Sequence, residues 1–430
     1  MQLPRALRAL GHRNYRLFFS GQLISLIGTW MQSVGEMWLV YRLTHSSLLL
    51  GTAGFFSQIP VFILAPFGGM LADTRDRRKI LVATQTSAMI LAGILATLTL
   101  TGVVKVWHVF TLAALLGIVN AVDIPTRQAF VADLVARDDL MNAIALNSSM
   151  FNGARVVGPA VAGILVASIG EGWCFFANSA SYIAVITGLL MMTFAGQRQR
   201  KQQMEISAFE HIAEGFRFVF AAPAIRALMM LLGAVSLFGI SYAVLMPIFA
   251  DQIFHAGAHG LGILMGFSGG GALVGAITLA FKKRVKGLGT WVTVSAAMFG
   301  VGLMAFSFSR HFWLSCALIV CSGFAMMVQM SSSNTLIQSM VPDRLRGRVM
   351  AVYSMMFMGM APLGSLLAGS VAEHIGAPHT VAIGAGLCVV AAGVFGYFLP
   401  QIRPHARELI IAQQMQAAVP AEPNNARLVT

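Results

Sequence analysis

Three ionisable side chains lie inside long apolar stretches of this sequence: Glu36, Asp123 and Arg155. A charge at the centre of a membrane-spanning helix costs ~2.5 to 3.5 kcal/mol on insertion scales, so such a residue usually faces a cavity or a partner. A carboxyl group in that position can exchange a proton, and a guanidinium can bind an anionic group. These residues are therefore the first candidates for a site that handles ions or polar ligands.

Polar neighbours extend two of these positions into stripes. Gln32 precedes Glu36 by one helical turn, and Ser148, Asn152 and Arg155 share a helix face through their spacing of 4 and 3. We expect both stripes to face one central cavity. Our hypothesis is that Glu36 exchanges a proton with this cavity, whereas Arg155 modulates that exchange or meets an anionic group of a substrate.

Simpler interpretations remain open for two of the residues. Glu36 lies in the outer part of its apolar stretch, where it could simply be hydrated. Asp123 lies close to the end of its stretch, four residues before Arg127, so it could serve only to pair with that arginine across one helical turn.

The elements that position these residues are predicted from composition. Of the 430 residues, 57% are hydrophobic and 10% are charged, whereas soluble domains carry roughly 25% charged residues. About a dozen apolar stretches are each long enough to cross a ~30 Å hydrocarbon layer as a helix. The sequence therefore predicts an all-α membrane protein with twelve transmembrane helices, at 18–41, 47–71, 79–101, 106–125, 143–168, 173–195, 224–250, 258–281, 288–308, 312–335, 349–371 and 378–400.

A charged segment between two apolar stretches indicates the topology. Six of the seven residues at 73–79 are charged, so they must form a water-facing hairpin. Of the 29 basic residues, 25 lie in this hairpin, the two termini and alternate loops, whereas the other loops hold only Arg42, Lys105 and Arg310. This asymmetry predicts that both termini are cytoplasmic, in a bacterial-type inner membrane. The basic charge is thus topological, and we expect no nucleic-acid partner.

The sequence repeats itself at an offset of 206 residues. This offset aligns 134–170 with 340–376 without a gap, and it also places Gly69 on Gly275 in the charged hairpin. One offset for two distant features predicts two pseudo-symmetric six-helix halves of the same orientation, at 1–195 and 224–400. A second copy of the hairpin would keep Lys282, Lys283 and Arg284 but has Leu279 in place of Asp73.

The repeat also concentrates the ionisable side chains in the first half. At the 206-residue offset, the partners of Glu36 and Asp123 are Tyr242 and Gln329, and the partner of Arg155 is Ala361. We therefore include Tyr242 and Gln329 among the candidate cavity residues.

Two segments lie outside the halves. The linker 196–223 contains Ser207-Ala-Phe-Glu210, which reads as a capping box, followed by apolar residues on one side of a helix at Phe209, Ile212, Phe216 and Phe220. We expect an amphipathic helix on the cytoplasmic surface. The segment 401–430 is predicted to be a polar tail.

Glycines at helical spacing predict where helices approach closely. Gly262, Gly266 and Gly270 recur at every fourth residue, which matches the small-xxx-small pattern of membrane helix packing. The stretch 143–168 carries a related series, namely Gly153, Gly158, Pro159 and Gly163. Two interpretations of these glycines remain open: the helices move against each other along this contact during function, or they simply pack closely.

The hairpin resembles the signature of the loop between helices 2 and 3 of the major facilitator superfamily. Its matching residues are Gly69, Leu71, Ala72, Asp73, Asp76, Arg77 and Arg78, with Asp76 where glycine is commoner. The series Gly153, Gly158, Pro159 and Gly163 resembles the glycine-proline motif of the superfamily's antiporters. The segments NYRLFFSGQLISLIGTWMQ and ALNSSMFNGARVVGPAVAG are similar to the exporter branch that contains the enterobactin exporter and macrolide efflux pumps.

The resemblance implies a mechanism and a gate. Helices 5 and 8 would pack across the halves, and Asp73 would sit against the start of helix 11, near residues 346–349. Arg77 and Arg78 would reach Asp133, Asp138 or Asp139, so that the hairpin latches the cytoplasmic side. One departure from many drug/proton antiporters is that helix 4 lacks an intramembrane arginine.

The sequence thus predicts a secondary active transporter that exports a small amphipathic or siderophore-like molecule by alternating access and proton antiport. The alternatives are a proton-independent or uptake permease for a metabolite or lysolipid and, less favoured, a membrane sensor or enzyme. We expect no enzymatic activity, no cofactor beyond a proton gradient and no metal, since the four cysteines lack metal-ligand spacing. The expected partners are a small-molecule substrate and the lipid bilayer, and the expected state is a monomer.

Overall fold

The structure is a computed structural model that describes residues 5–193, 208–281 and 287–418, and within these ranges every regular element is a helix. Eleven helical segments are long and apolar enough to cross a membrane. Helix α1 (Arg13–Thr44) is the twelfth crossing. It falls short of the other eleven in hydropathy because it carries Gln22, Gln32 and Glu36. The prediction of an all-helical, twelve-crossing protein is therefore confirmed.

The first half consists of six long helices. They are α1, α2 (Ser47–Thr74), α3 (Arg77–Leu100), α4 (Val106–Asp133), α5 (Leu140–Ile169) and α6 (Glu171–Leu190), with short 3-10 helices at Arg5–Gly11 (η1) and Arg137–Asp139 (η2). Helix α1 packs against α5 and α6, α2 against α4, and α3 against both α4 and α6. The polar positions of α1 and α5 thus come together within one bundle.

The second half repeats this arrangement with broken helices. The seventh crossing comprises α8 (Pro223–Ala234), η3 (Val235–Gly239), α9 (Tyr242–Ile248) and η4 (Phe249–Ile253), and both η elements are π-helical. The other crossings are α10 (Gly257–Ala280), α11 (Leu288–Phe308), α12 (Phe312–Met340), α13 (Asp343–Met358) with α14 (Met360–Ile375), and α15 (Ala377–Ala418). The predicted continuous helix 224–250 is therefore interrupted. Pro247 lies within α9 and lacks the N–H of a regular helical turn.

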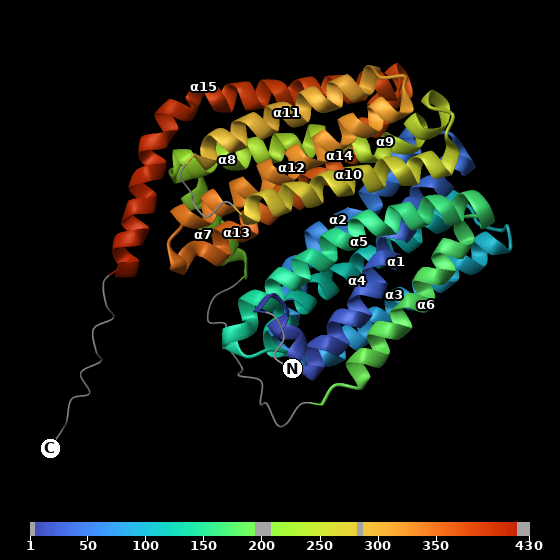
Figure 1. The fold of residues 1–430 in the computed structure, drawn as a ribbon, viewed down its shortest axis with the longest axis horizontal. Coiled ribbons are helices and arrows are strands. Elements are labelled where there is room, and N and C mark those ends of the chain that lie inside the picture. The colour runs from blue at the N-terminus through green and yellow to red at the C-terminus, as the bar shows by residue number, and fades with distance from the viewer. Residues whose placement is uncertain (1–4, 194–207, 282–286, 419–430) are drawn as a thin grey trace.

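The two halves meet through two pairs of helices, α5 with α10 and α2 with α14. Figure 1 shows that they converge at one end of the molecule and spread apart at the other. We call the end at which α1 begins and the α2–α3 hairpin turns the terminal face, and the opposite end the distal face. The molecule is closed at the distal face and open at the terminal face.

The segments outside the two bundles differ in part from the sequence prediction. Helix α7 (Ala208–Ala221) is present and packs against α13, with Phe216 and Phe220 stacked at 6.4 Å between ring centroids. Ser207, the side chains of Phe209 and Ile212, and the basic cluster at 282–284 lie outside the described residues.

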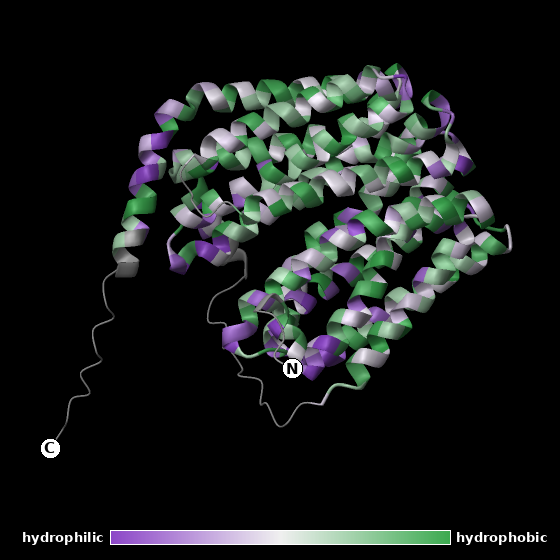
Figure 2. Cartoon of the chain, viewed as in Figure 1, coloured by the Kyte–Doolittle hydropathy of each residue, from purple (hydrophilic) through white to green (hydrophobic). Residues whose placement is uncertain are grey.

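The predicted polar tail is wrong at its start. Helix α15 continues to Ala418, through Pro400 and Pro404, and bends away from the bundle (Figure 1). The physical reason is that Ile402, Ala406 and Leu409 follow a helical spacing and pack against the apolar core. Figure 2 shows the resulting mixture of apolar and polar positions along this part of the helix.

Candidate functional site

The seam between α5 and α10 is built on two glycines. A Cβ atom placed on Gly262 would lie 2.5 Å from the Cα of Gly163 and 2.6 Å from the carbonyl oxygen of Pro159, so no side chain fits there. Deeper in the seam, a Cβ on Gly269 would lie 2.7 Å from the carbonyl oxygen of Arg155. Backbones approach this closely only where both helices present small residues.

Three other predicted seam glycines do not make this contact. A Cβ on Gly158 would meet Trp30 and Ile27 of α1, which belong to the same half, and Gly153 and Gly270 have nothing within 4 Å of such an atom. Gly266 lies at ordinary distance, 3.6 Å, from the carbonyl oxygen of Val156. The seam thus uses the positions 262, 266 and 269, because a spacing of 4 and 3 stays on one helix face better than a spacing of 4 and 4.

Hydrogen bonds across the halves close the distal face. The carboxylate oxygen Oε2 of Glu373, on α14, accepts bonds from Ser46 Oγ at 3.0 Å, Ser47 Oγ at 2.8 Å and the backbone N–H of Leu48 at 3.0 Å. Glu373 therefore caps the N-terminus of α2, where an anion is favoured. Nearby, Tyr41 of α1 donates to Asp251 of η4 at 2.7 Å.

A polar cluster joins the two halves in the membrane interior. The guanidinium carbon of Arg155 lies 5.7 Å from the ring centroid of Trp30, within the range of a cation–π contact. Across the interface, Tyr242 shares a hydrogen bond of 2.9 Å with Ser268. The carbonyl oxygen of Arg155 packs against Gly269, the residue that follows Ser268, so the Tyr242–Ser268 pair lies at the same level of the seam. The structure thus brings together two predicted residues, one from each half, with Trp30 and Ser268 added.

Glu36 belongs to a hydrogen-bonded chain within the first half. Gln32 donates to Glu36 through its Nε2 at 2.7 Å, and Asn178 of α6 donates to the Oε1 of Gln32 at 2.6 Å. Gln32 and Asn178 are buried, whereas Glu36 is half-buried. Sequence reasoning missed Asn178, although a carboxamide inside the apolar stretch 173–195 is a detectable signal.

Asp123 makes its hydrogen bonds to α3 within the first half. Its Oδ1 accepts bonds from Thr84 at 2.7 Å and from Gln85 at 2.8 Å, and Arg127 lies 3.7 Å from its Oδ2. The expected ion pair between Asp123 and Arg127 is thus present at a long distance, whereas the shorter hydrogen bonds from Thr84 and Gln85 connect α4 to α3. A cavity of about 210 Å³ adjoins this carboxylate inside the first half.

Two further candidates make local or no contacts. Asn152 is buried and donates to the carbonyl oxygen of Ser148 one turn before it, at 2.8 Å. Gln329 is buried on α12, and its Nε2 has no hydrogen-bond partner among the described residues.

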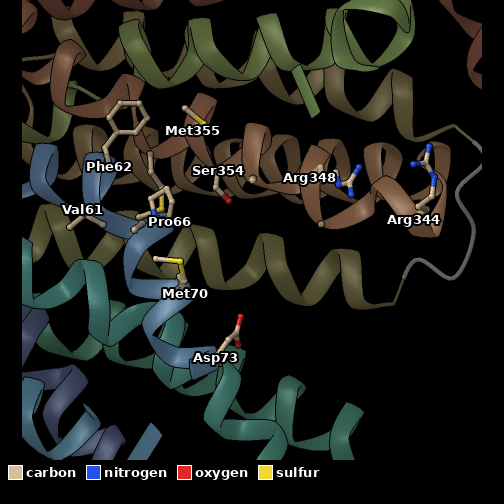
Figure 3. Close-up of a pocket in the computed structure, with 14 residues that line it drawn as sticks. Val61, Phe62, Pro66, Met70, Asp73, Arg344, Arg348, Ser354 and Met355 are labelled. Atoms are coloured by element: carbon tan, nitrogen blue, oxygen red, sulfur yellow. The ribbon is translucent and has the colours of Figure 1, made fainter. Parts of the chain in front are cut away.

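A cavity of about 680 Å³ opens between α2 and α13 on the side of the terminal face. Its walls are largely apolar and rich in methionine, with Met70, Met355 and Met358 among the lining residues. Figure 3 shows Asp73 on the α2 wall and Arg344 and Arg348 on the α13 wall. Gly69 also lines this cavity.

Hydrogen bonds and ion pairs stabilise the α2–α3 hairpin and attach it to α4 and α6. Asp76 caps α3 by accepting a bond from the backbone N–H of Lys79 at 3.2 Å, which explains an aspartate at this position. Arg77 pairs with Asp133 at 2.9 Å and with Asp73 at 3.2 Å. Arg78 donates to the carbonyl oxygens of residues 189 and 190.

The charged residues of the hairpin and those of α13 form separate ion pairs. Asp73 pairs with Arg77 within the hairpin, whereas Arg348 and Arg344 of α13 pair with Glu214 of the linker helix α7. Of the remaining acidic residues expected near the hairpin, Asp139 pairs with His12 at 2.8 Å.

An all-helical membrane protein of two six-helix halves, with polar residues from both halves at their interface, is a major facilitator transporter in architecture. The chain belongs to the MFS_3 family of that superfamily, described as transmembrane secretion effectors, whose family model matches residues 5–426.

Curated relatives cover nearly the whole chain. A staphyloferrin A transporter of Staphylococcus aureus is 26% identical over 89% of this chain and 96% of its own length. The multidrug efflux pump Tap of Mycolicibacterium fortuitum is 26% identical over 87% of this chain and 93% of its own. The enterobactin exporter EntS of Shigella boydii is 24% identical over 89% of this chain and 91% of its own length.

Solved structures share the fold. The nucleoside transporter NupG matches with a TM-score of 0.72 over 92% of this chain and 99% of its own, at 16% sequence identity. A POT family transporter in complex with 5-aminolevulinic acid matches with a TM-score of 0.73 over 91% of this chain and 96% of its own, at 9% sequence identity. Together with the family, these relatives identify the chain as a multi-pass membrane transporter.

Proposed function

We propose that this protein is a proton-coupled exporter of a small amphipathic molecule that carries an anionic, siderophore-like group, and that it works as a monomer. The observation that carries the proposal is the cluster of Arg155 and Trp30 from one half with Tyr242 and Ser268 from the other, joined where Gly269 packs against the backbone of Arg155. A guanidinium binds carboxylate and catecholate oxygens, and the rings offer apolar surface. A substrate bound between the halves would respond to their rocking.

Export is the proposed direction of transport, and two observations support it. The positive-inside rule places the basic terminal face in the cytoplasm of an inner membrane. The cavity of about 680 Å³ then opens to the cytoplasm, where an exported substrate must enter. Relatives that are a siderophore exporter and a multidrug efflux pump support the same direction.

Glu36 is the proposed proton-coupling residue. It is half-buried, and the bond from Gln32 holds one of its oxygens. A carboxyl group in this setting can change its charge when water reaches it from one side only. Each proton that enters down 100 mV releases ~2.3 kcal/mol, which biases export by about fiftyfold.

The α2–α3 hairpin is the proposed cytoplasmic gate. Asp73 faces Arg344 and Arg348 across the open cavity (Figure 3). Rocking of the halves would bring these opposite charges together at the start of α13, where the helix N-terminus also favours an anion. The ion pairs between Glu214 and the two arginines would have to yield or rearrange in that state.

The proposal is tested with purified protein in vesicles under an imposed proton gradient. Paired substrates are a radiolabelled tris-catecholate siderophore and a neutral amphipathic dye. We expect Arg155→Ala to abolish transport of the anionic substrate and to retain transport of the dye, with Arg155→Lys intermediate. Arg310→Ala, at an exposed position outside the cluster, is the matched control. Equal loss for both substrates would exclude anion recognition by Arg155.

A proton-independent permease is the second candidate. The observation that favours it is the position of the arginine of α4, because Arg127 lies near the terminal end of the helix rather than at its centre and contacts Asp123 and Gln22. In the same vesicles, transport that is insensitive to the proton gradient, in wild type and in Glu36→Gln alike, would select this candidate. Chemical conversion of the substrate would instead indicate an enzyme.

A further inference from the structure

A groove on the outer surface of the second half is apolar along most of its length and basic at one end. It lies between α8 and α15 and has a volume of about 620 Å³, within the range of about 300 to 1,000 Å³ that ligand sites occupy. Helix α15 forms the outer edge of this half in Figure 1. Exposed apolar side chains line the groove, including Met230, Val394 and Phe398, with exposed fractions of 61%, 53% and 45%.

The depth of the groove matches one leaflet of a bilayer. Along α8 it runs from Pro223 to Ala234, which at 1.5 Å per residue is about 16 Å. Half of a ~30 Å hydrocarbon layer is about 15 Å. The groove therefore extends from the membrane surface at the terminal face to about the bilayer midplane, which is the depth that one acyl chain occupies.

Polarity changes along the groove in the same direction. Its deep end is lined by apolar residues, whereas its end at the terminal face holds Arg226, Gln401 and His405. The guanidinium of Arg226 is anchored there, because its Nη1 donates to the carbonyl oxygen of Phe220 at 3.1 Å. None of the thirteen lining residues is acidic. The next turns of α15 carry two exposed cations, Arg403 and Arg407, and one exposed carboxylate, Glu408.

We propose that this groove binds one anionic phospholipid from the leaflet at the terminal face, with an acyl chain between α8 and α15 and the phosphate at Arg226 and His405. Basic pockets between transmembrane helices at this level bind anionic head groups. Helix α15 contains Pro400 and Pro404 and bends away from the bundle (Figure 1), so its continuation would lie beside the bound head group. A zwitterionic lipid would fill the groove but would lack the charge that the basic end favours.

The experiment measures lipid binding to the full-length purified protein by native mass spectrometry. The probes are phosphatidylglycerol and phosphatidylcholine with identical acyl chains. We expect phosphatidylglycerol to bind several-fold more tightly. Arg226→Ala should weaken it about fivefold, which corresponds to ~1 kcal/mol for one basic residue, and should leave phosphatidylcholine unchanged. Arg310→Ala is the control for loss of an exposed arginine elsewhere.

A second variant tests the apolar part of the site. Ala391→Phe fills the groove with a ring and should weaken both lipids, whereas Ile183→Phe, at a 56% exposed position on α6, should weaken neither. Equal affinity for the two lipids, or no effect of either groove variant, would overturn the proposal. Displacement of phosphatidylglycerol by millimolar inorganic phosphate would also overturn it, because the site would then take a free anion. Binding is measured without transport, so these outcomes are independent of the proposed function.

Discussion

Substitution of one seam glycine should open the distal face. In Gly262→Ala, the new methyl group would lie 2.5 Å from Gly163 Cα, 2.6 Å from Pro159 O and 2.7 Å from Gly163 N. All three atoms belong to the backbone of α5, so no side chain can rotate to make room. Helices α5 and α10 must therefore separate where the halves now touch.

The size of the effect follows from the cost of overpacking. Extra methyl groups in a tight contact cost about 1 to 3 kcal/mol. The methyl group destabilises only the distal-closed state, because Gly163 and Gly262 separate when the halves rock. The population should therefore move toward the distal-open state by about 5- to 150-fold. The gain in helix propensity from Gly to Ala, roughly 1 kcal/mol, is present in both states and does not shift the equilibrium.

The assay is a distance measurement between spin labels at residues 105 and 310, one exposed distal position in each half. The labels are attached to cysteines introduced after replacement of the four native ones. Gly262→Ala and Gly163→Ala should both lengthen the distance and slow transport.

The matched controls lie on the same two helices. Gly153→Ala and Gly270→Ala place a methyl group where nothing lies within 4 Å, so they should leave the distance unchanged. An unchanged distance in Gly262→Ala, or an equal shift in the two controls, would refute the steric reasoning.

Three further predictions concern the charged residues. Glu373→Ala removes three hydrogen bonds that cap α2 and should favour the distal-open state by about fivefold, or ~1 kcal/mol; an unchanged distance between the labels would contradict it. Asp73→Asn should keep the terminal cavity open. A cysteine introduced at Met355 should then react faster with a thiol label, and an unaltered labelling rate would leave the hairpin only a topological role. Glu36→Gln should abolish proton-driven transport but preserve exchange of substrate without a gradient, and proton-driven transport at the wild-type rate would exclude the coupling role.

The sequence alone predicts the number of membrane crossings and the internal repeat. Apolar length sets where a helix can span a bilayer, and one offset of 206 residues related two distant motifs. The hairpin was also predictable, because six charges in seven residues cannot enter hydrocarbon and Asp76 is a good N-cap for α3. These features depend on residues that are close together in the chain.

Some errors arose from local patterns that were read too simply. The polar appearance of the chain after Pro400 hid a helix whose apolar positions, such as Ile402 and Leu409, recur at helical spacing. The spacing of four from Gly266 predicts Gly270 at the seam, although a helix of 3.6 residues per turn places Gly269 there instead. Gly158 lies five residues from Gly163 and therefore faces α1 of its own half.

By itself, the sequence determined the membrane class, the twelve helices, the two related halves and the identity of the unusual polar residues, because hydropathy and periodicity are properties of single segments. Only the tertiary structure decided which of these residues meet. Asn178 completes the chain to Glu36, Gly269 of the second half packs against the backbone of Arg155, and Glu373 caps a helix more than 300 positions away. Such contacts depend on how each helix is rotated in the bundle, and that rotation is set by close packing between helices rather than by any one of them.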